Sequence, residues 1–322
     1  MYDQHGRQIN YLRLSITPRC NLNCFYCRPG ACPPNQGMHA VKDLLTAAEF
    51  GRIARASATL GIRKIRLTGG EPLMRPDLEE IIRLIREIPE IEDLSMSTNG
   101  HGLAERAATL QQAGLMRVNL SLDSLQEERY RKITGGGILD QVLSAIDACL
   151  AVGLMPVKVN TVLVRGVNDD EIADLIDLTR NRPIAVRFIE LMPMNQYDRN
   201  QERLITGSEI LAAFPMLQRM PVEDPSAPSE DFKIPGCVGT VGLIRPISHR
   251  FCSSCNRIRI TADGMLKPCL GDLKEVSLRD ALASGDDHAL LTVMAQAIDT
   301  KPEGHSFNST FSPTRSMDRT GG

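Results

Sequence analysis

Along the N-terminal part of the chain, short apolar runs alternate with longer segments whose apolar residues recur every three or four positions. The short runs predict β-strands and the longer segments predict amphipathic helices. Regular alternation of the two indicates repeated β–α units on a parallel sheet. The strands are predicted at 12–17, 64–68, 94–98, 117–122, 156–164 and 186–191.

The segments between these strands carry helix signals. Thr46 and Glu49 form a predicted capping box, and a second helix follows Pro76 and Asp77, with apolar residues recurring every three or four positions. Further helices are predicted near 103–112, 139–152 and 169–179. Six β–α units are too few to close an eight-stranded barrel. The predicted fold is therefore α/β, a partial (β/α)6 TIM-like barrel with chemistry at the carboxyl ends of its strands.

The alternation ends near residue 195, which divides the chain into a predicted barrel, 1–195, and a C-terminal region, 196–322. Residues 221–235 are rich in Pro, Ser and acidic side chains and predict a surface loop or linker. Short helices are expected at 208–214 and 288–298, with strands from 238 onward. The last eighteen or so residues are polar and predict a flexible tail.

Composition narrows the class of protein. The 322 residues are enough for one large α/β domain with an extension, and a net charge of −2 does not favour a general nucleic-acid binder. No apolar stretch has the length of a membrane span, and the N-terminus lacks an apolar signal core. Six of the nine cysteines form two groups of three, which favours metal sites in a reducing cytoplasm over disulfides.

The first group, Cys20, Cys24 and Cys27, has Cys-x3-Cys-x2-Cys spacing. Three thiolates can hold three irons of a [4Fe–4S] cluster and leave the fourth iron open, whereas ligation by thiolates normally uses four. Half of a structural zinc site is the alternative, although such sites usually close with four ligands. Cys32 lies nearby, but as a fourth ligand it would close that iron, and Cys149 lies in a helical pattern typical of the core.

The second group, Cys252, Cys255 and Cys269, also has three members. A zinc site with His249 as fourth ligand is an open alternative. Arg257 and Arg259 are two residues apart on a predicted strand and therefore point to one face. Paired guanidinium groups suit a polyphosphate, although a solvated strand face is the simpler interpretation.

Other strand ends carry candidate binding groups. Gly69 and Gly70 follow a strand in the string GGEP, where the backbone can approach a ligand closely and its carbonyls can accept from an ammonium group. Ser121 and Met192 would on their own be structural residues. The chain has no P-loop string, so phosphates would be held by scattered basic side chains.

In the first cysteine group and the GGEP string the chain resembles the radical S-adenosylmethionine (SAM) superfamily, in which Tyr26 fits the aromatic position beside the last cysteine. The strings that resemble the GTP 3′,8-cyclase family run nearly end to end: GRQINYLRLSITPRCNLNCFYC, KIRLTGGEPLMR, RFIELMPMN, NRIRIT and the terminal Gly321-Gly322. The resemblance implies a lyase that converts GTP to 3′,8-cyclo-7,8-dihydroguanosine 5′-triphosphate, the first step of molybdenum cofactor biosynthesis. It implies two [4Fe–4S] clusters and SAM as cofactors. A 5′-deoxyadenosyl radical would take the hydrogen from C3′ of GTP, and C3′ would then attack C8.

The same resemblance assigns roles by position. Cluster ligands are Cys20, Cys24, Cys27, Cys252, Cys255 and Cys269. SAM contacts are Tyr26, Gly70, Ser121 and Met192. GTP contacts are Arg13, Arg66, Ser97, Lys158, Arg257 and Arg259, and Lys64 joins them by its charge and its strand face. Arg257, Arg259, Gly321 and Gly322 are expected to act in catalysis, with the tail reaching into the site.

The implied partners are GTP, a flavodoxin- or ferredoxin-type electron donor and the next pathway enzyme, cyclic pyranopterin monophosphate synthase. Neither nucleic acid nor a membrane is expected, and the chain is expected to be a monomer or homodimer. Pro18, Arg28, Ser97 and Thr320 depart from residues more usual in the family. The alternatives are a radical SAM peptide-maturing enzyme with an auxiliary cluster, and a non-enzymatic iron–sulfur or zinc-stabilised binding protein.

Overall fold

The computed structural model describes residues 1–27, 44–194, 201–307 and 315–321. Arg28, Cys32 and Gly322 lie outside these ranges. Over the described residues, twelve strands form one sheet in the order β12-β11-β10-β1-β2-β3-β4-β5-β6-β9-β8-β7. The strands are β1 Tyr11–Ser15, β2 Lys64–Thr68, β3 Asp93–Thr98, β4 Arg117–Ser121, β5 Val157–Leu163, β6 Ile184–Glu190, β7 Gln218–Arg219, β8 Ser229–Lys233, β9 Thr240–Ile244, β10 Arg257–Ile260, β11 Met265–Lys267 and β12 Val276–Ser277.

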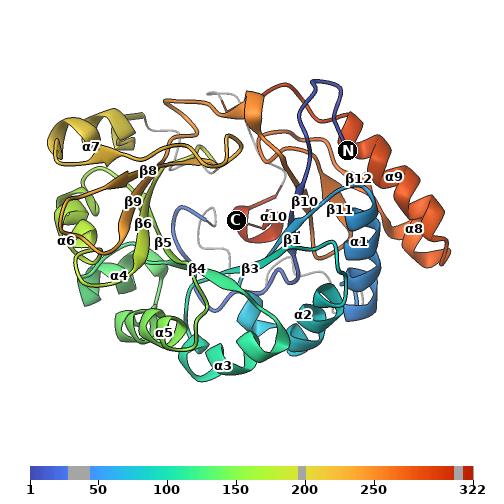
Figure 1. Ribbon diagram of the computed structural model, residues 1–322, viewed down its shortest axis with the longest axis horizontal. Helices are drawn as coiled ribbons and strands as arrows, with labels where there is room; N and C mark the ends of the chain where they lie inside the picture. Colours follow the sequence, from blue (N-terminus) through green and yellow to red (C-terminus); the bar gives the residue numbers. More distant parts are fainter. Residues whose placement is uncertain (28–43, 195–200, 308–314, 322) are drawn as a thin grey trace.

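The six predicted barrel strands, β1 to β6, are confirmed as consecutive parallel neighbours. The C-terminal region extends the same sheet at both edges, because β10 pairs in parallel with β1 and β9 pairs in parallel with β6. The result is an open barrel of TIM-like form, curled around a central space (Figure 1). Helix α10, at the end of the chain, lies inside the ring of strands in this view.

Most helices follow the sequence pattern. They are α1 Ala47–Thr59, α2 Leu78–Arg86, α3 Leu103–Ala113, α4 Glu127–Thr134, α5 Leu139–Ala151, α6 Ile172–Asp177, α7 Gly207–Ala213, α8 Arg279–Ala283, α9 Asp287–Asp299 and α10 Met317–Thr320. The capping box of α1 is present, with the Thr46 hydroxyl accepting from the backbone of Glu49. Helix α4 was not predicted, since its sequence EERYRKIT is dominated by charged residues.

Two expectations for the C-terminal region are wrong. Part of the predicted loop at 221–235 is strand β8, which pairs with β9 through Phe232, the one buried residue of that strand. The end of the chain is not a flexible tail over 315–321, because α10 forms there and Asp318 and Thr320 are buried. Both buried side chains are hydrogen-bonded locally: Asp318 accepts from the Ser316 hydroxyl, and the Thr320 hydroxyl donates to the Met317 carbonyl at 3.2 Å.

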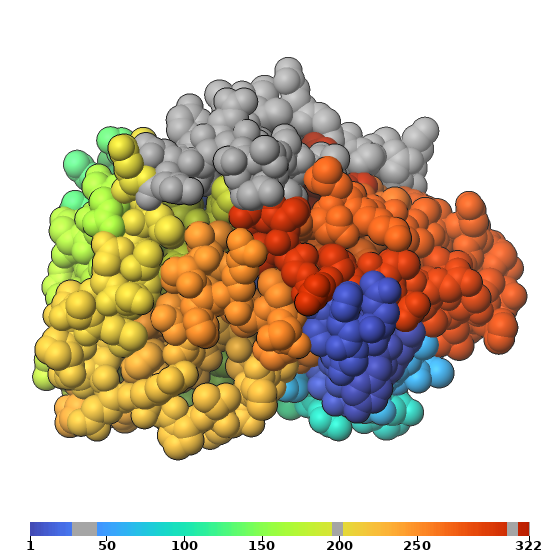
Figure 2. Space-filling view, turned by 90° about the horizontal axis from the view of Figure 1, so that it is seen from above, coloured from blue at the N-terminus to red at the C-terminus, as the bar shows by residue number. Residues whose placement is uncertain are grey.

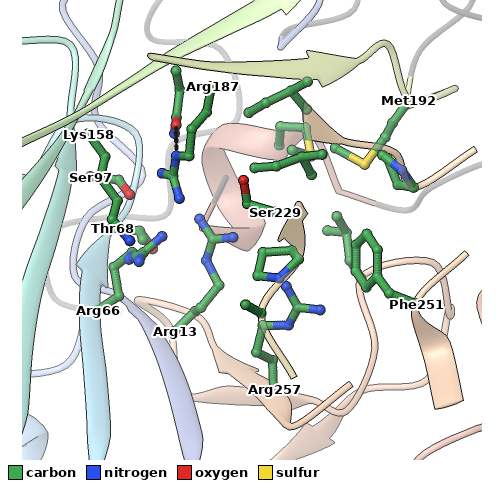
Figure 3. Close-up of a pocket in the computed structure, with 18 of the residues that line it drawn as sticks. Arg13, Arg66, Thr68, Ser97, Lys158, Arg187, Met192, Ser229, Phe251 and Arg257 are labelled. Carbon is green, nitrogen blue, oxygen red and sulfur yellow. Dashed lines mark hydrogen bonds between the residues drawn. The ribbon is translucent and has the colours of Figure 1, made fainter. Parts of the chain in front are cut away.

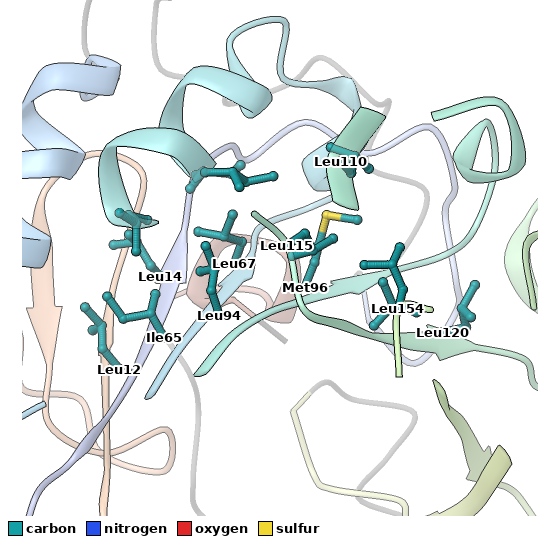
Figure 4. Packing of buried hydrophobic residues seen from close by; sticks show 14 of the residues in the cluster. Leu12, Leu14, Ile65, Leu67, Leu94, Met96, Leu110, Leu115, Leu120 and Leu154 are labelled. Carbon is teal, nitrogen blue, oxygen red and sulfur yellow. The ribbon is translucent and has the colours of Figure 1, made fainter. Parts of the chain in front are cut away.

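The core lies between the outer face of the sheet and the helices. Because side chains alternate along a strand, Leu12 and Leu14 of β1 and Ile65 and Leu67 of β2 face outward and are fully buried (Figure 4). The residues between them, such as Arg13 and Arg66, consequently face the interior of the barrel. The apolar packing of the outer face thus fixes which side chains line the central space.

No single described helix is long and apolar enough to cross a membrane, although α4 and α5, bent by 95° at their junction, reach the required length and composition together.

Removing a core side chain should destabilise the sheet. Leu67→Ala should lower the free energy of unfolding by about 2–5 kcal/mol, because Leu67 is 0% exposed and its loss leaves a cavity. Leu273→Ala is the matched control, since Leu273 is 51% exposed, and it should change stability by less than about 0.5 kcal/mol. Urea denaturation measures both; equal effects of the two substitutions would contradict the assignment of Leu67 to the core.

Candidate active site

One large cavity of about 620 Å³ runs through the barrel, and both cysteine groups line it. Strand direction places them at opposite ends. Cys20 follows β1, at the carboxyl end of the parallel strands, whereas Cys252 and Cys255 precede β10, at the amino end. Cys269 follows β11, which runs antiparallel to β10, and therefore returns to the same amino end.

The first cysteine group is held by the loop after β2. The Gly70 amide donates to the carbonyl of Thr17 at 2.7 Å, and the Glu71 amide donates to the carbonyl of Arg19, also at 2.7 Å. A Cβ atom on Gly70 would lie 2.2 Å from the Arg19 carbonyl oxygen, so this close approach requires glycine. The Gly70 and Glu71 amides thus hold the segment before Cys20 in place, and Gly70 itself lines the cavity.

Tyr26 is fixed by a residue that sequence reasoning missed. Its hydroxyl donates to Asp123 Oδ2 at 2.6 Å, while Asp123 Oδ1 accepts from the Val162 amide at 2.9 Å. Burial raises the pKa of Asp123 to about 6, although these hydrogen bonds favour the carboxylate. The string SLD at the end of β4 gave the only sequence signal for Asp123, and Ser121 of the same string lines the cavity.

Glu71 has a structural role at the same end of the barrel. Its carboxylate accepts from the Thr98 hydroxyl at 2.7 Å and from the backbone amides of Asn99 and Leu73 at 2.7 and 3.0 Å. Burial raises the pKa of Glu71 to about 7 against these bonds. The carboxylate therefore joins the loops after β2 and β3 beneath the first cysteine group.

Cationic side chains crowd the wall between the two cysteine groups. Arg13, Arg66, Lys158 and Arg187 point toward one another across the cavity (Figure 3). Strand register explains the first two, because Arg13 lies beside Arg66 on β2 and beside Arg259 on β10. Such a concentration of positive charge suits a polyanion.

The electrostatics reflect this crowding. Burial, together with the neighbouring guanidinium groups, lowers the pKa of Lys158 to about 8, that of Arg187 to about 9 and that of Arg259 to about 10. The pKa of Arg13 is also lowered, chiefly by burial and then by Arg259 and Arg66. The direction of these shifts follows from burying several cations together without an anion.

Arg187 was missed by sequence reasoning, although it lies in the string RFIE of β6. Its Nε donates to Asn160 Oδ1 at 3.0 Å, and the amide oxygen of Asn119 accepts from Arg187 and Arg66 at 2.8 and 2.7 Å. Two predicted ligand groups have unused atoms: Ser97 Oγ and Arg13 Nε are buried and have no hydrogen-bond partner within the described ranges. These atoms are available to a bound molecule.

Lys64 lines the cavity as predicted from its strand face, where its Nζ forms an ion pair with Asp224 Oδ2 at 2.9 Å. Met192 lies across the cavity from Arg66 and Lys158 (Figure 3), and packs beside Met194 and Phe307. Lys64 and Met192 therefore line the same cavity.

The second cysteine group has a cationic environment. Arg257 Nη2 lies 3.5 Å from Cys255 Sγ, and the Arg257 guanidinium stacks 4.9 Å above the Phe251 ring. Burial alone would raise the pKa of Cys255, but Arg257 and Lys301 lower it to about 6. Arg257 and Arg259 both line the cavity, in keeping with their predicted common face.

The donor sets fit iron–sulfur clusters better than zinc. In the described part of the chain, no three His, Cys, Asp or Glu residues are placed to hold a metal ion between them. His249, the candidate fourth zinc ligand, is largely exposed, is absent from the cavity wall and faces Glu230 at 3.9 Å. Three thiolates around a cavity suit a [4Fe–4S] cluster with one iron left open to a ligand.

The chain end completes the cavity wall. The Gly321 carbonyl accepts from Arg259 Nη1 at 2.8 Å, and a Cβ on Gly321 would lie 2.4 Å from Thr68 Oγ1. Gly321 has φ = +79°, which favours glycine, and the Met317 amide approaches the Cys27 carbonyl at 3.4 Å. The segment 315–321 therefore contacts the loop of the first cysteine group and a basic residue of the cavity.

This fold and site define a radical SAM protein, and residues 14–179 match the radical SAM superfamily. The solved structure of Streptococcus suis SuiB bound to S-adenosylmethionine has the same fold, with a TM-score of 0.61 at 14% identity; the match covers 89% of this chain and 65% of that one. Residues 184–307 match the Molybdenum Cofactor Synthesis C family. The GTP 3′,8-cyclases of Alkaliphilus oremlandii and Peptoclostridium acidaminophilum are 45% and 43% identical to the chain, covering all of it and 100% and 98% of their own lengths. The chain belongs to the GTP 3′,8-cyclase family.

Polyphosphate affinity should depend on the protonation of Lys158. Above about pH 8 the free protein loses this charge, so binding of tripolyphosphate must take up a proton and weakens by up to about tenfold per pH unit. Titration calorimetry between pH 7 and 9 measures the affinity. The ratio of wild-type to Lys158→Met affinity should fall as pH rises, and a constant ratio would exclude Lys158 from the binding site.

Proposed function

We propose that this chain converts GTP to 3′,8-cyclo-7,8-dihydroguanosine 5′-triphosphate, in the first step of molybdenum cofactor biosynthesis. The observation that carries the proposal is the single cavity lined by two cysteine groups at its opposite ends and by basic side chains between them. Full-length similarity to GTP 3′,8-cyclases supports the same reaction. A peptide-maturing radical SAM enzyme lacks this support, because SuiB, whose structure was also solved bound to the precursor peptide SuiA, resembles this chain in fold alone.

A [4Fe–4S] cluster at Cys20, Cys24 and Cys27 would supply the electron that cleaves SAM to methionine and a 5′-deoxyadenosyl radical. The chain's own residues orient SAM beside that site. Gly70 and Ser121 face the ligand from the ends of β2 and β4, and Met192 supplies an apolar wall. Asp123 keeps the Tyr26 ring in one position through its 2.6 Å hydrogen bond.

GTP would lie between the two cysteine groups. A second cluster at Cys252, Cys255 and Cys269 would bind the guanine base. The triphosphate would be held by Arg13, Lys64, Arg66, Ser97, Lys158, Arg257 and Arg259, all of which line the cavity. Arg187 belongs with this set by position and charge. When the base and the phosphates are both fixed, C3′ of the ribose stays within reach of the SAM bound at the other end of the cavity. This matters because a reacting atom misplaced by about 1 Å can cost roughly a hundredfold in rate.

The two parts of the chain would divide this work. Residues 1–195 bind SAM and supply the phosphate contacts from Arg13 to Lys158, whereas 196–322 carry the second cluster site and the tail. Arg257, Arg259 and the tail residues Gly321 and Gly322 hold the base and phosphates in register. A flavodoxin- or ferredoxin-type protein would deliver electrons, and cyclic pyranopterin monophosphate synthase would receive the product. The arrangement of six of the nine cysteines in two metal-type groups supports a reducing, cytoplasmic setting.

Anaerobic reconstitution tests the function. The protein should take up about eight irons, as two four-iron clusters require, and should consume GTP in the presence of reductant and SAM while forming 5′-deoxyadenosine and a cyclised nucleotide. Mass spectrometry identifies the product. A result of about four irons per chain, with zinc at the second cysteine group and no loss of GTP, would agree with the radical SAM fold but contradict GTP as the substrate.

Two cysteine variants test the roles of the two ends of the cavity separately. Cys24→Ala should abolish 5′-deoxyadenosine formation, because it removes a ligand of the SAM-side cluster. Cys255→Ala should spare SAM cleavage that is uncoupled from substrate but stop GTP turnover. Chromatographic assay of 5′-deoxyadenosine and GTP distinguishes the two. Cys149→Ala is the control, since Cys149 is buried in the core away from the cavity; activity retained in Cys24→Ala would reject the first assignment.

Deleting Gly321 and Gly322 should reduce product formation by about tenfold or more, since the Gly321 carbonyl contacts Arg259 within the cavity. The thermal midpoint should stay near that of the full chain, because the deletion removes no core side chain. Product assay and thermal denaturation give the two readings. Unchanged activity would remove the tail from catalysis.

A further inference from the structure

Lys301 is a buried lysine that joins the two segments carrying Cys255 and Cys269. It follows α9 and is only 1% exposed. Its Nζ donates to the carbonyl of Arg257 at 2.7 Å and to the carbonyl of Pro268 at 2.8 Å. Arg257 lies two residues after Cys255, and Pro268 directly precedes Cys269, so one ammonium group sets the separation of the two segments.

This ammonium group has no carboxylate partner among the described residues. The negative groups that act on it are Cys255 and Cys269, whereas Arg7 and Arg257 add further positive charge. A buried charge without a counter-charge is costly, and neutral carbonyl groups offset only part of that cost. The missing negative charge must therefore come from the thiolates and from whatever they bind.

Cys252, the third cysteine of this group, is linked to the segment after Lys301 by Arg7. Arg7 forms an ion pair with Asp3, and this pair carries no net charge. Arg7 Nη1 donates to the carbonyls of Cys252 and Glu303, each at 2.9 Å, while Arg7 Nε pairs with Asp3 at 2.6 Å. Figure 2 shows the N-terminal residues packed against the C-terminal segments that supply these carbonyls. Arg7 therefore positions Cys252 as part of a neutral pair, whereas Lys301, like Arg257, brings charge that no carboxylate of the described residues compensates.

We propose that Lys301 is a positioning residue and the counter-ion of the second cluster site. Its two hydrogen bonds hold the Cys255 and Cys269 segments at the separation that a [4Fe–4S] cluster needs. Its charge stabilises the cluster's more negative, reduced state and so raises the reduction potential, which depends on nearby charge and hydrogen bonding. The inference rests on the cluster assignment within the proposed function and needs no GTP turnover.

The test measures the properties of the second cluster in protein that lacks the first cluster. In full-length protein with Cys20, Cys24 and Cys27 replaced by Ser, Lys301 is changed to Met, Gln or Arg. Lys233→Met is the matched control, because Lys233 Nζ also donates to two carbonyls, those of Val238 at 2.7 Å and Gly239 at 2.9 Å, but does not line the cavity. Iron per chain, the rate of iron loss to a chelator and the reduction potential by EPR-monitored titration are measured.

Lys301→Met and Lys301→Gln should retain the cluster about tenfold less well and should show a lower reduction potential. Lys301→Arg should keep a potential near that of the parent, and Lys233→Met should match the parent throughout. If Lys301→Met does not fold, Lys301→Gln decides, because its amide can still donate to a carbonyl. Parent values in Lys301→Gln, or an equal fall of the potential in Lys301→Arg, would overturn the counter-ion role.

The outcomes also separate this inference from the proposed function. A parent protein that binds no cluster at the second cysteine group would overturn both the inference and the second-site assignment. If the parent binds the cluster and the Lys301 effects appear, but wild-type protein does not consume GTP, the inference stands and the proposed substrate fails.

Discussion

The concentration of like charge inside the barrel is the constraint on which the rest of the site depends. Strand register places Arg259, Arg13 and Arg66 side by side on three adjacent strands. Desolvation and mutual repulsion destabilise these cations and their neighbours: the pKa of Arg259 is lowered to about 10 and that of Arg187 to about 9. The apolar outer face of the sheet holds them in place, because turning any strand over would expose its core residues. The free energy of folding thus keeps these cationic side chains together, in a cavity that favours the binding of a polyanion.

Part of that charge is compensated by the chain's own oxygen atoms. Asp224 pairs with Lys64, and the Gly321 carbonyl accepts from Arg259. Both acceptor oxygens come from the C-terminal region and reach side chains of β2 and β10. Arg13 Nε and Ser97 Oγ keep no partner in the described chain. The positive charge of the cavity is therefore only partly compensated. Both of these buried atoms, Arg13 Nε and Ser97 Oγ, lie between the two cysteine groups.

Local sequence pattern predicted most of the barrel, because alternation of period two and period three to four is set within each segment. Both cysteine groups were also recognisable, since their ligands are close in sequence. The attachment of β9 and β10 to opposite edges of the sheet could not be recognised from the sequence. It pairs residues that are far apart in the chain, such as Arg13 and Arg259. Asp123, Arg187 and Lys301 were missed for a related reason: each acts through a partner brought near only by folding.

Lys301 shows how the two cysteine groups differ in physical terms. Near the first group, the buried charged side chains are carboxylates, Asp123 and Glu71, whose pKa values are raised to about 6 and about 7. Near the second, the half-buried Arg257 and the buried Lys301 are cations, which lower the pKa of Cys255 to about 6. Negative surroundings disfavour the addition of an electron and positive surroundings favour it. The barrel therefore gives two chemically similar ligand sets opposite electrostatic environments, and the SAM side is expected to have the lower reduction potential, which suits a site that must donate its electron.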